Sequence, residues 1–507
     1  MLTHHPGTRC CLILVALMCA ARSARSDDKL DPAALDAIMD DALKAWHVPG
    51  AALVVVRDDK VFHMKAYGVR RLGESDPVTP DTLFAIGSTT KAFTTTAMAM
   101  LVDEKKMDWD DLARKHIEFF ELADPLASAN CTLRDLVTHR TGLKDHLLLE
   151  FGAPWDTVET IRKMGRVKLS HSFRSQFDYS NVPFTATGYA VGLAAKSNYN
   201  DFVRTRIFEP LGMKNVNFRV ADMEKAPDHA SPHNVTKEDK EEVMPWISID
   251  QAGGAGAINA SVRDLAPWLR FQLGDGTFEG KRLVSSKNLE ETHTPQIVMR
   301  ADGMRKLLLP DTHQVSYGLG WMIYDYRGHL VVAHGGGTFG YTCQVVLLPK
   351  EKTAFAVLTN AQTPMASIVP NALADCLLGL EKKDWNKSTK GLIALSRLSQ
   401  AATEKKPTPG TKPSRELAAY QGDYDDGAYG TVAIQEKDGG LVLQWSSFTL
   451  KLEHFHYDTF ALKSEDRAKT WDLFDKEKLV FNLGADGEVA RMTFLGQEFK
   501  KVKKASK

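Results

Sequence analysis

A serine followed three residues later by a lysine, Ser88 and Lys91, opens a run of mostly small and apolar residues, 92–102. Residues three apart share a helix face, so the lysine amine can reach the serine hydroxyl one turn earlier. Serine is a weak nucleophile until a base takes its proton, and lysine acts as that base only when burial or nearby positive charge lowers its pKa. The apolar run predicts a buried helix. The pair therefore predicts a serine nucleophile with a lysine base.

This spacing is weak evidence when it stands alone. Ser26 and Lys29 have the same spacing, but no apolar helix follows them. A helix-capping serine with a surface lysine is the simpler interpretation of Ser88 and Lys91 unless other parts of the chain agree. Two further stretches do agree.

The first stretch is Tyr179-Ser180-Asn181, the only Tyr-x-Asn among the 12 tyrosines, and it precedes another apolar helical pattern. A tyrosine hydroxyl beside a lysine can relay a proton to a leaving group. An asparagine amide can hold both a lysine amine and a substrate carbonyl. A core aromatic residue followed by a turn asparagine would explain the stretch taken alone.

The second stretch, His334-Gly335-Gly336-Gly337, ends a strand-like run. Consecutive glycines allow a substrate to lie along a strand edge, where backbone N–H groups can stabilise an oxyanion. A glycine-rich turn is the simpler alternative. A rival is the HGGG loop of α/β-hydrolase esterases, but that loop precedes a GxSxG motif, and the chain contains no GxSxG.

These motifs, in this order, resemble the serine β-lactamase and penicillin-binding superfamily. Within it the chain is most similar to the group of class C β-lactamases, DD-peptidases, D-aminopeptidases and related esterases. The resemblance extends from about residue 35 to residue 380, and the stretches LRDLVTHRTGL, QAGGAGAINASVRDLAPWL and YGLGW also fit it. It implies a serine hydrolase that works through an acyl-enzyme.

The resemblance also implies a role for each motif residue. Ser88 would be the acylated nucleophile and Lys91 its base partner, while Tyr179 would relay protons. Asn181 would orient Lys91 and the substrate amide. The backbone N–H groups of Ser88 and Gly337 would form the oxyanion hole.

One motif departs from the β-lactamase pattern. His334-Gly335-Gly336 stands where class C enzymes carry Lys-Thr-Gly, so the resemblance implies a substrate-binding role for these residues. Histidine, with a reference pKa near 6.5, is mostly neutral at pH 7 unless a neighbour raises that value. We therefore expect neutral esters or amides to be preferred to β-lactams. The alternative on the same fold is a protein that binds penicillins or cell-wall peptides without turnover, or a weak β-lactamase.

The strand and helix patterns indicate two domains. Strand-like runs lie at both ends of residues 27–385, with mostly helical patterns between them, which predicts an α/β (α+β) fold. Its antiparallel sheet would be formed from both ends of the domain, with an inserted helical lobe. A charged, proline-rich linker is expected over 386–414. Short alternating runs over 415–507 predict a small all-β barrel that resembles the lipocalin-like domain of such hydrolases. Because every candidate catalytic residue precedes the linker, the barrel is expected to be dispensable for the chemistry.

Composition and the N-terminus limit the partners and the location. Lysine plus arginine and aspartate plus glutamate both total 64, so no overall charge draws the chain to nucleic acid or acidic membranes. A small molecule or peptide, cell-wall fragments included, is the expected substrate. Residues 1–26 resemble a signal peptide whose apolar run is too short for a stable membrane span, which predicts a secreted or periplasmic protein. The oligomeric state is left open.

The remaining cysteines offer no further chemistry. Beyond the expected signal peptide only three are left, Cys131, Cys343 and Cys376, and they are far apart in the sequence. They form neither a disulfide framework nor a CxxC metal site. We therefore expect no metal and no cofactor.

Overall fold

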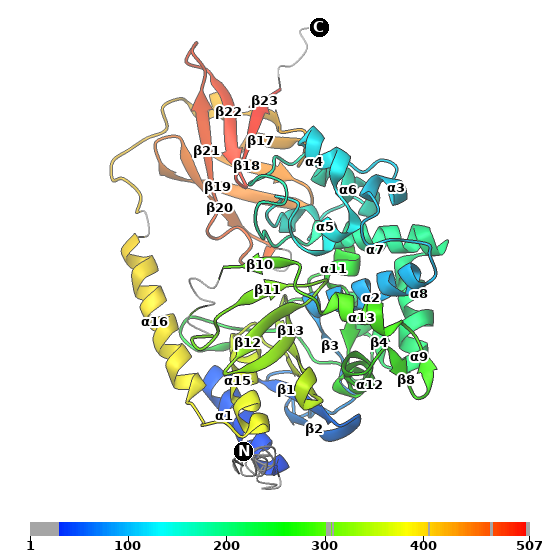
Figure 1. The fold of residues 1–507 in the computed structure, drawn as a ribbon. Coiled ribbons are helices and arrows are strands. Elements are labelled where there is room, and N and C mark those ends of the chain that lie inside the picture. The colour runs from blue at the N-terminus through cyan, green and yellow to red at the C-terminus, as the bar shows by residue number, and fades with distance from the viewer. Residues whose placement is uncertain (1–29, 301–305, 307–308, 404–405, 467–469, 503–507) are drawn as a thin grey trace, which may run out of the picture.

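The structure is a computed structural model that describes residues 30–300, 306, 309–403, 406–466 and 470–502. Its central layer is an eight-stranded antiparallel sheet in the order β10-β11-β12-β13-β14-β15-β1-β2 (Figure 1). The first two strands of the chain and the six at 297–359 build this sheet, so the prediction of a sheet from both ends of the domain is confirmed. The strands are β1 (Gly50–Arg57), β2 (Lys60–Gly68), β10 (Ile297–Met299), β11 (Val315–Tyr317), β12 (Met322–Tyr326), β13 (His329–Thr338), β14 (Tyr341–Leu348) and β15 (Thr353–Thr359). The expected signal peptide, residues 1–26, lies outside the described residues.

Strand β1 shows why the sheet is central. Its side chains alternate between two cores, as the period of a strand requires. Ala52, Val54 and Val56 face the helical lobe, whereas the residues between them face the opposite layer. A strand that is covered on both faces is apolar at every position, as this one is. The opposite layer consists of α1 (Pro32–Trp46) and α15 (Met365–Leu378).

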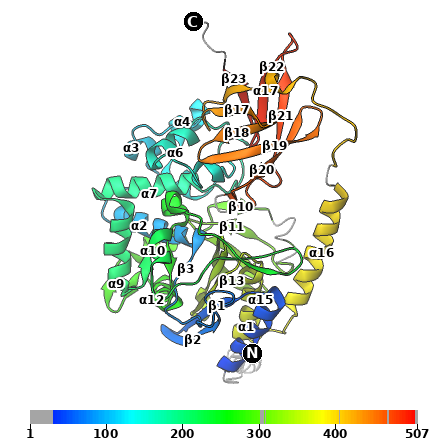
Figure 2. The same ribbon diagram turned by 180° about the vertical axis from the view of Figure 1, so that it is seen from behind.

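The inserted helical lobe covers the other face of the sheet and is confirmed as predicted (Figures 1 and 2). Its innermost helix, α2, is buried over nearly its whole length. The helices are α2 (Thr90–Asp103), α3 (Ala113–His116), α4 (Pro125–Asn130), α5 (Leu133–Val137), α6 (Thr157–Met164), α7 (Val182–Ala195), α8 (Tyr199–Val203), α9 (Glu209–Leu211), α10 (Val220–Glu224), α11 (Gly253–Gly256), α12 (Val262–Leu273) and α13 (Ser286–Thr292). Among the described residues no helix is both long and apolar enough to cross a bilayer.

The described part of the chain also contains three small sheets of two or three strands outside the central sheet. Strand β3 (Phe84–Ala85), which leads to Ser88, belongs to one of these sheets. Ile86, the residue after β3, donates its backbone N–H to the carbonyl of Ile258. This small sheet is β3, β7 (Asn259–Ala260) and β4 (Val216–Asn217); the others pair β5 (His233–Val235) with β6 (Glu241–Val243), and β8 (Thr277–Phe278) with β9 (Lys281–Arg282).

The C-terminal part forms a closed barrel in which the eight strands follow chain order, which confirms the predicted all-β barrel. A short helix, α17 (Leu417–Tyr420), precedes it. The strands are β16 (Gly422–Asp425), β17 (Val432–Lys437), β18 (Gly440–Trp445), β19 (Phe448–His456), β20 (Thr459–Ser464), β21 (Lys478–Leu483), β22 (Val489–Phe494) and β23 (Gln497–Lys501).

The expected linker, 386–414, differs from the prediction in its first half. A helix, α16 (Trp385–Thr403), occupies that half and leads from the sheet toward the barrel (Figure 1). The first proline of the stretch is Pro407, so nothing interrupts helix formation before it. Only the part from there onward has the composition of a linker.

The barrel packs against the helical lobe rather than hanging free (Figure 2). Its Tyr429 hydroxyl lies 2.7 Å from Nδ1 of His146. Phe448 lies so close to Gly152 that a Cβ there would come within 2.4 Å of its ring. The barrel therefore holds the lobe segment 146–155 in place.

Candidate active site

Ser88 lies on a 3-10 turn, Gly87–Thr89, that runs directly into α2. Lys91 is in the first turn of α2, three residues after Ser88, and its Nζ lies 3.1 Å from Ser88 Oγ. Gly87 has a φ of +50°, and a Cβ there would come within 2.9 Å of the backbone of Gly337. The turn therefore needs a glycine, both for its conformation and for its close approach to β13.

The Lys91 amine is fully buried and has two further partners. It donates to Asn181 Oδ1 at 2.7 Å and to the carbonyl oxygen of Ala255 at 2.9 Å. Both oxygens can only accept, so a neutral amine that donates one N–H to each directs its lone pair at Ser88. Burial lowers the pKa of Lys91 to about 7, while the carboxyls of Asp145 and Glu150 act in the opposite direction. The geometry and the lowered pKa both suit a general base.

Tyr179 approaches the serine from the other side. Its hydroxyl donates to Ser88 Oγ at 2.8 Å, and its ring lies 4.9 Å from Lys91 Nζ. Burial raises the pKa of the Tyr179 hydroxyl above its usual value, so this group keeps its proton at neutral pH. Ser88 is therefore placed between a base and a proton donor.

Asp145 determines how the Asn181 side chain is oriented. Its carboxylate accepts from the Asn181 backbone N–H at 3.2 Å and from Nδ2 at 3.2 Å. Because a carboxylate only accepts, Nδ2 must face Asp145 and Oδ1 must face Lys91. Sequence analysis did not identify Asp145, although it lies two residues after the LRDLVTHRTGL stretch. Glu150 was missed too; it is buried, and burial raises its pKa to about 8.

The three glycines of β13 have different surroundings. A Cβ on Gly336 would come within 2.0 Å of the Ile86 carbonyl oxygen, so a glycine is required where β13 passes the Ser88 turn. A Cβ on Gly335 would come closest to the flexible end of the Gln344 side chain, at 2.8 Å. One on Gly337 would meet nothing within 4 Å. Gly337 therefore faces open space.

The edge of β13 beside Ser88 is unpaired in the sheet. Strand β12 pairs with β13 only as far as Ala333. On the other side, β14 continues to the closing pair Thr338 and Tyr341 of a two-residue hairpin. Hydrogen-bonded and non-hydrogen-bonded pairs alternate from that closing pair, so the N–H of Gly337 points away from β14 toward the unpaired edge. A backbone donor at this place can hold an oxyanion.

His334 lies behind this edge and not in the pocket wall. Only 4% of its surface is exposed, and both ring nitrogens have protein partners: the Tyr317 hydroxyl at 2.9 Å and the Gly335 carbonyl oxygen at 2.6 Å. Burial lowers the pKa of His334 to about 3, so it carries no positive charge at neutral pH. The structure thus corrects the expected role: the ring belongs to the protein's own hydrogen-bond network.

A cavity of about 300 Å³ opens beside Ser88. Of the predicted binding residues, Asn181 and Gly337 line it, whereas His334, Gly335 and Gly336 do not. None of the lining side chains carries a charge. They are Gly87, Ser88, Leu147, Phe151, Asn181, Ile249, Ala252, Ala255, Gly256, Gly337, Thr338, Phe339, Thr342 and Gln362.

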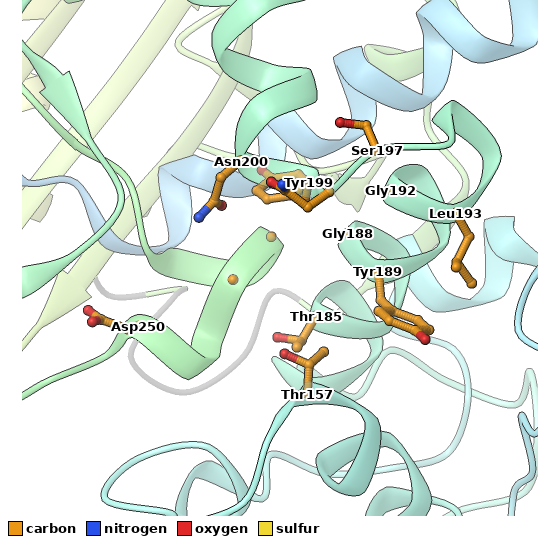
Figure 3. A pocket seen from close by; sticks show the side chains of 13 residues that line it. Thr157, Thr185, Gly188, Tyr189, Gly192, Leu193, Ser197, Tyr199, Asn200 and Asp250 are labelled. Carbon is orange, nitrogen blue, oxygen red and sulfur yellow. The ribbon is translucent and has the colours of Figure 1, made fainter.

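A second cavity of about 330 Å³ lies between α7 and the segment 250–254 (Figure 3). Thr157 and Thr185 are both on its wall. It contains none of the predicted site residues, so it is separate from the cavity beside Ser88. Among the residues that the structure describes, no group of His, Cys, Asp or Glu could hold a metal ion.

The fold and the arrangement of Ser88, Lys91 and Tyr179 are those of the beta-lactamase type of serine hydrolase fold. Comparison with known proteins agrees. The chain belongs to the beta-lactamase family, whose model matches residues 35–377. A domain of unknown function matches residues 406–504, which include the barrel.

The relatives are distant. The chain is 27% identical over 437 residues to the unguisins hydrolase ungD of Aspergillus violaceofuscus, covering 79% of this chain and 76% of that protein. It is 25% identical to protein flp of Staphylococcus aureus, covering 64% of this chain and 62% of that protein. Its fold is similar to that of the octameric penicillin-binding protein homologue from Pyrococcus abyssi, with a TM-score of 0.61 at 22% identity, over 93% of this chain and all of the other.

Proposed function

We propose that this protein is a secreted serine hydrolase that cleaves an ester or amide bond through an acyl-enzyme on Ser88. The observation that carries the proposal is the set of partners around Lys91. Two acceptor-only oxygens, from Asn181 and Ala255, take its two N–H bonds, and the third direction leads to Ser88 Oγ. A surface lysine beside a helix-capping serine would have no such arrangement.

In acylation, Ser88 Oγ attacks the substrate carbonyl while its proton passes to Lys91 Nζ. The negative charge that develops on the carbonyl oxygen is stabilised by the backbone N–H groups of Ser88 and Gly337. The bond to the leaving group then breaks as Tyr179 donates its proton to that group and regains one from Lys91. Water reverses these proton transfers to release the acid and restore Ser88.

The substrate is a neutral ester or amide with an apolar group beside the scissile bond. The cavity beside Ser88 is walled by Leu147, Phe151, Ile249 and Phe339 and has no charged side chain. An apolar group gains about 25 cal/mol for each Å² of surface that it buries there. A substrate carboxylate would lose its hydration in this cavity without an ion pair in return.

A pair of matched esters tests this proposal. We expect p-nitrophenyl valerate to be hydrolysed with a kcat/KM at least tenfold above that of mono-p-nitrophenyl glutarate, which replaces the terminal methyl by a carboxylate. Nitrocefin, a β-lactam that also carries a carboxylate, is expected to be slow. Ser88→Ala serves as the control and is expected to lose all three activities. An equal rate for the two esters, or activity that survives Ser88→Ala, would overturn the proposal.

Secretion is proposed from residues 1–26 alone. The apolar run followed by small residues supports cleavage by a signal peptidase. N-terminal sequencing of the protein recovered from the culture medium or periplasm tests this proposal. A mature N-terminus near residue 27 is expected, and retention of Met1 in the cytoplasm would contradict it.

A further inference from the structure

Three buried side chains that do not touch the reacting atoms form a continuous hydrogen-bonded chain behind the site. His139 Nε2 lies 3.2 Å from the Tyr317 hydroxyl, which lies 2.9 Å from His334 Nε2. His139 follows α5, whereas Tyr317 belongs to β11 and His334 to β13, which are separated in the sheet by β12. All three side chains are at most 4% exposed. The chain thus crosses from the helical lobe to the sheet.

Backbone groups at the two ends determine every hydrogen-bond direction in this chain. The Ser180 N–H can only donate, so His139 Nδ1 accepts and Nε2 carries the proton, which it donates to Tyr317. The Gly335 carbonyl can only accept, so the proton of His334 is on Nδ1 and Nε2 accepts from Tyr317. Tyr317 therefore accepts one bond and donates one, and both imidazoles are neutral.

Both ends of the chain are next to proposed catalytic groups. Ser180 stands between Tyr179 and Asn181, and Gly335 precedes the glycines that pass the Ser88 turn. The His139 ring also lies against the Tyr179 ring, with centroids 4.3 Å apart. Asp178 donates its backbone N–H to the His139 carbonyl at 2.8 Å, so segment 178–180 has a second hydrogen bond to His139.

We propose that His139, Tyr317 and His334 act as one positioning unit, which sets the distance between the Tyr179 hydroxyl and the unpaired edge of β13. This inference rests on the proposed function, because it assigns the unit to acylation of Ser88. Tyr317 is its central member, since it alone bonds to both imidazoles. A misplacement of about 1 Å between groups at an active site costs about 100-fold in rate.

The unit also explains why residue 334 cannot be exchanged by itself for the lysine of the β-lactamase pattern. A charged lysine ammonium offers only donors, so the Tyr317 proton would lose its acceptor while His139 continues to donate to the same oxygen. A buried hydroxyl without a partner is costly. The three residues must therefore change together, and substitutions at 317 and 334 are expected to be non-additive.

The rate of Ser88 labelling by a fluorophosphonate tests the unit without knowledge of the natural substrate. Tyr317→Phe is expected to lower the second-order labelling rate constant about ten- to a hundredfold. Tyr326→Phe is the matched control: it removes another buried hydroxyl of the same sheet, which bonds to Asp375 at 2.7 Å on the far face. The control is expected to label at the wild-type rate, and an unchanged rate for Tyr317→Phe would overturn the proposal.

Variants of His334 keep the test decisive if Tyr317→Phe does not fold. Glutamine can accept from Tyr317 and donate to Gly335, so His334→Gln is expected to label within about threefold of wild type, whereas His334→Leu is expected to lose at least tenfold. Equal rates for these two variants would overturn the proposal. Failure of the wild type to label at Ser88 would instead refute the proposed function, so the two failures are distinguishable.

Discussion

Burying a lysine amine has a cost in stability that depends on pH in a calculable way. Lys91 has a pKa of about 7 in the folded protein because of burial, against an ordinary value of 10.5. Between these two pH values the unfolded chain binds a proton at Lys91 that the folded protein does not bind. The free energy of unfolding therefore rises with pH across this window and is independent of this group below about pH 7.

The size of the effect follows from the two pKa values. The fall from 10.5 to about 7, at about 1.4 kcal/mol for each pH unit, corresponds to about 5 kcal/mol. Lys91→Met removes the titrating group but keeps much of the volume. It also leaves the Asn181 and Ala255 oxygens without their donor, which costs about 1–3 kcal/mol for each at any pH. Only the way in which the stability difference between the variant and wild type changes with pH therefore reports on the Lys91 pKa.

Urea unfolding of wild type and Lys91→Met, measured at intervals from pH 7 to pH 10, tests this reasoning. We expect the stability of the variant relative to wild type to fall by about 4 kcal/mol over this range. Ser88→Ala, which keeps the buried lysine, is the control and is expected to follow the wild type. A difference that stays constant with pH would refute the claim that Lys91 is neutral in the folded protein above pH 7.

Three further predictions concern activity. Lys91 must be neutral to act as the base, so kcat/KM is expected to fall about tenfold for each pH unit below the Lys91 pKa of about 7 and to level off above it. A flat profile of kcat/KM from pH 5 to 8 would contradict this. Tyr429→Phe removes the barrel hydroxyl that bonds to His146, the neighbour of the pocket-lining Leu147, and is expected to lower kcat/KM for p-nitrophenyl valerate about three- to tenfold. Tyr424→Phe removes a 2.7 Å bond to the Tyr420 carbonyl, away from the lobe, and is expected to leave kcat/KM unchanged. Equal effects of the two variants would mean that the barrel acts only through its own stability. Gly336→Ala is expected to abolish activity because the new Cβ would lie 2.0 Å from the Ile86 carbonyl oxygen. The Cβ of Gly337→Ala would have nothing within 4 Å, so this variant is expected to keep its activity within tenfold of wild type in the same assay. Loss of activity in both variants would contradict the assigned geometry.

Features that depend on local sequence were predictable. The helix Pro32–Trp46, for example, has a local start signal in Asp31, whose side chain caps it, and in a proline in the first turn. The approach of Lys91 to Ser88 depends on a spacing of three residues within one turn, so this spacing together with the two further motifs was enough. The sheet from both ends of the domain and the closed barrel followed from alternating patterns.

Features that depend on distant contacts were not predictable. His139 and Tyr317 are 178 residues apart, and no local pattern indicates that their side chains meet. His146 and Tyr429 are 283 residues apart, so no local pattern indicated that the barrel contacts the residue next to the pocket-lining Leu147. His334 was assigned to substrate because its position matched a family motif. Burial and the partners of its two ring nitrogens, which only the fold supplies, give it another role.

The measurement that tests the acyl-enzyme most directly is the mass of the protein during turnover. Wild type is mixed with p-nitrophenyl valerate, quenched in acid within seconds and analysed intact and after digestion. We expect a mass increase of one valeryl group, located on the peptide that contains Ser88, and no increase for Ser88→Ala. Hydrolysis of the ester with the acyl group on another residue would contradict the central claim, as would hydrolysis by a protein that never carries the group.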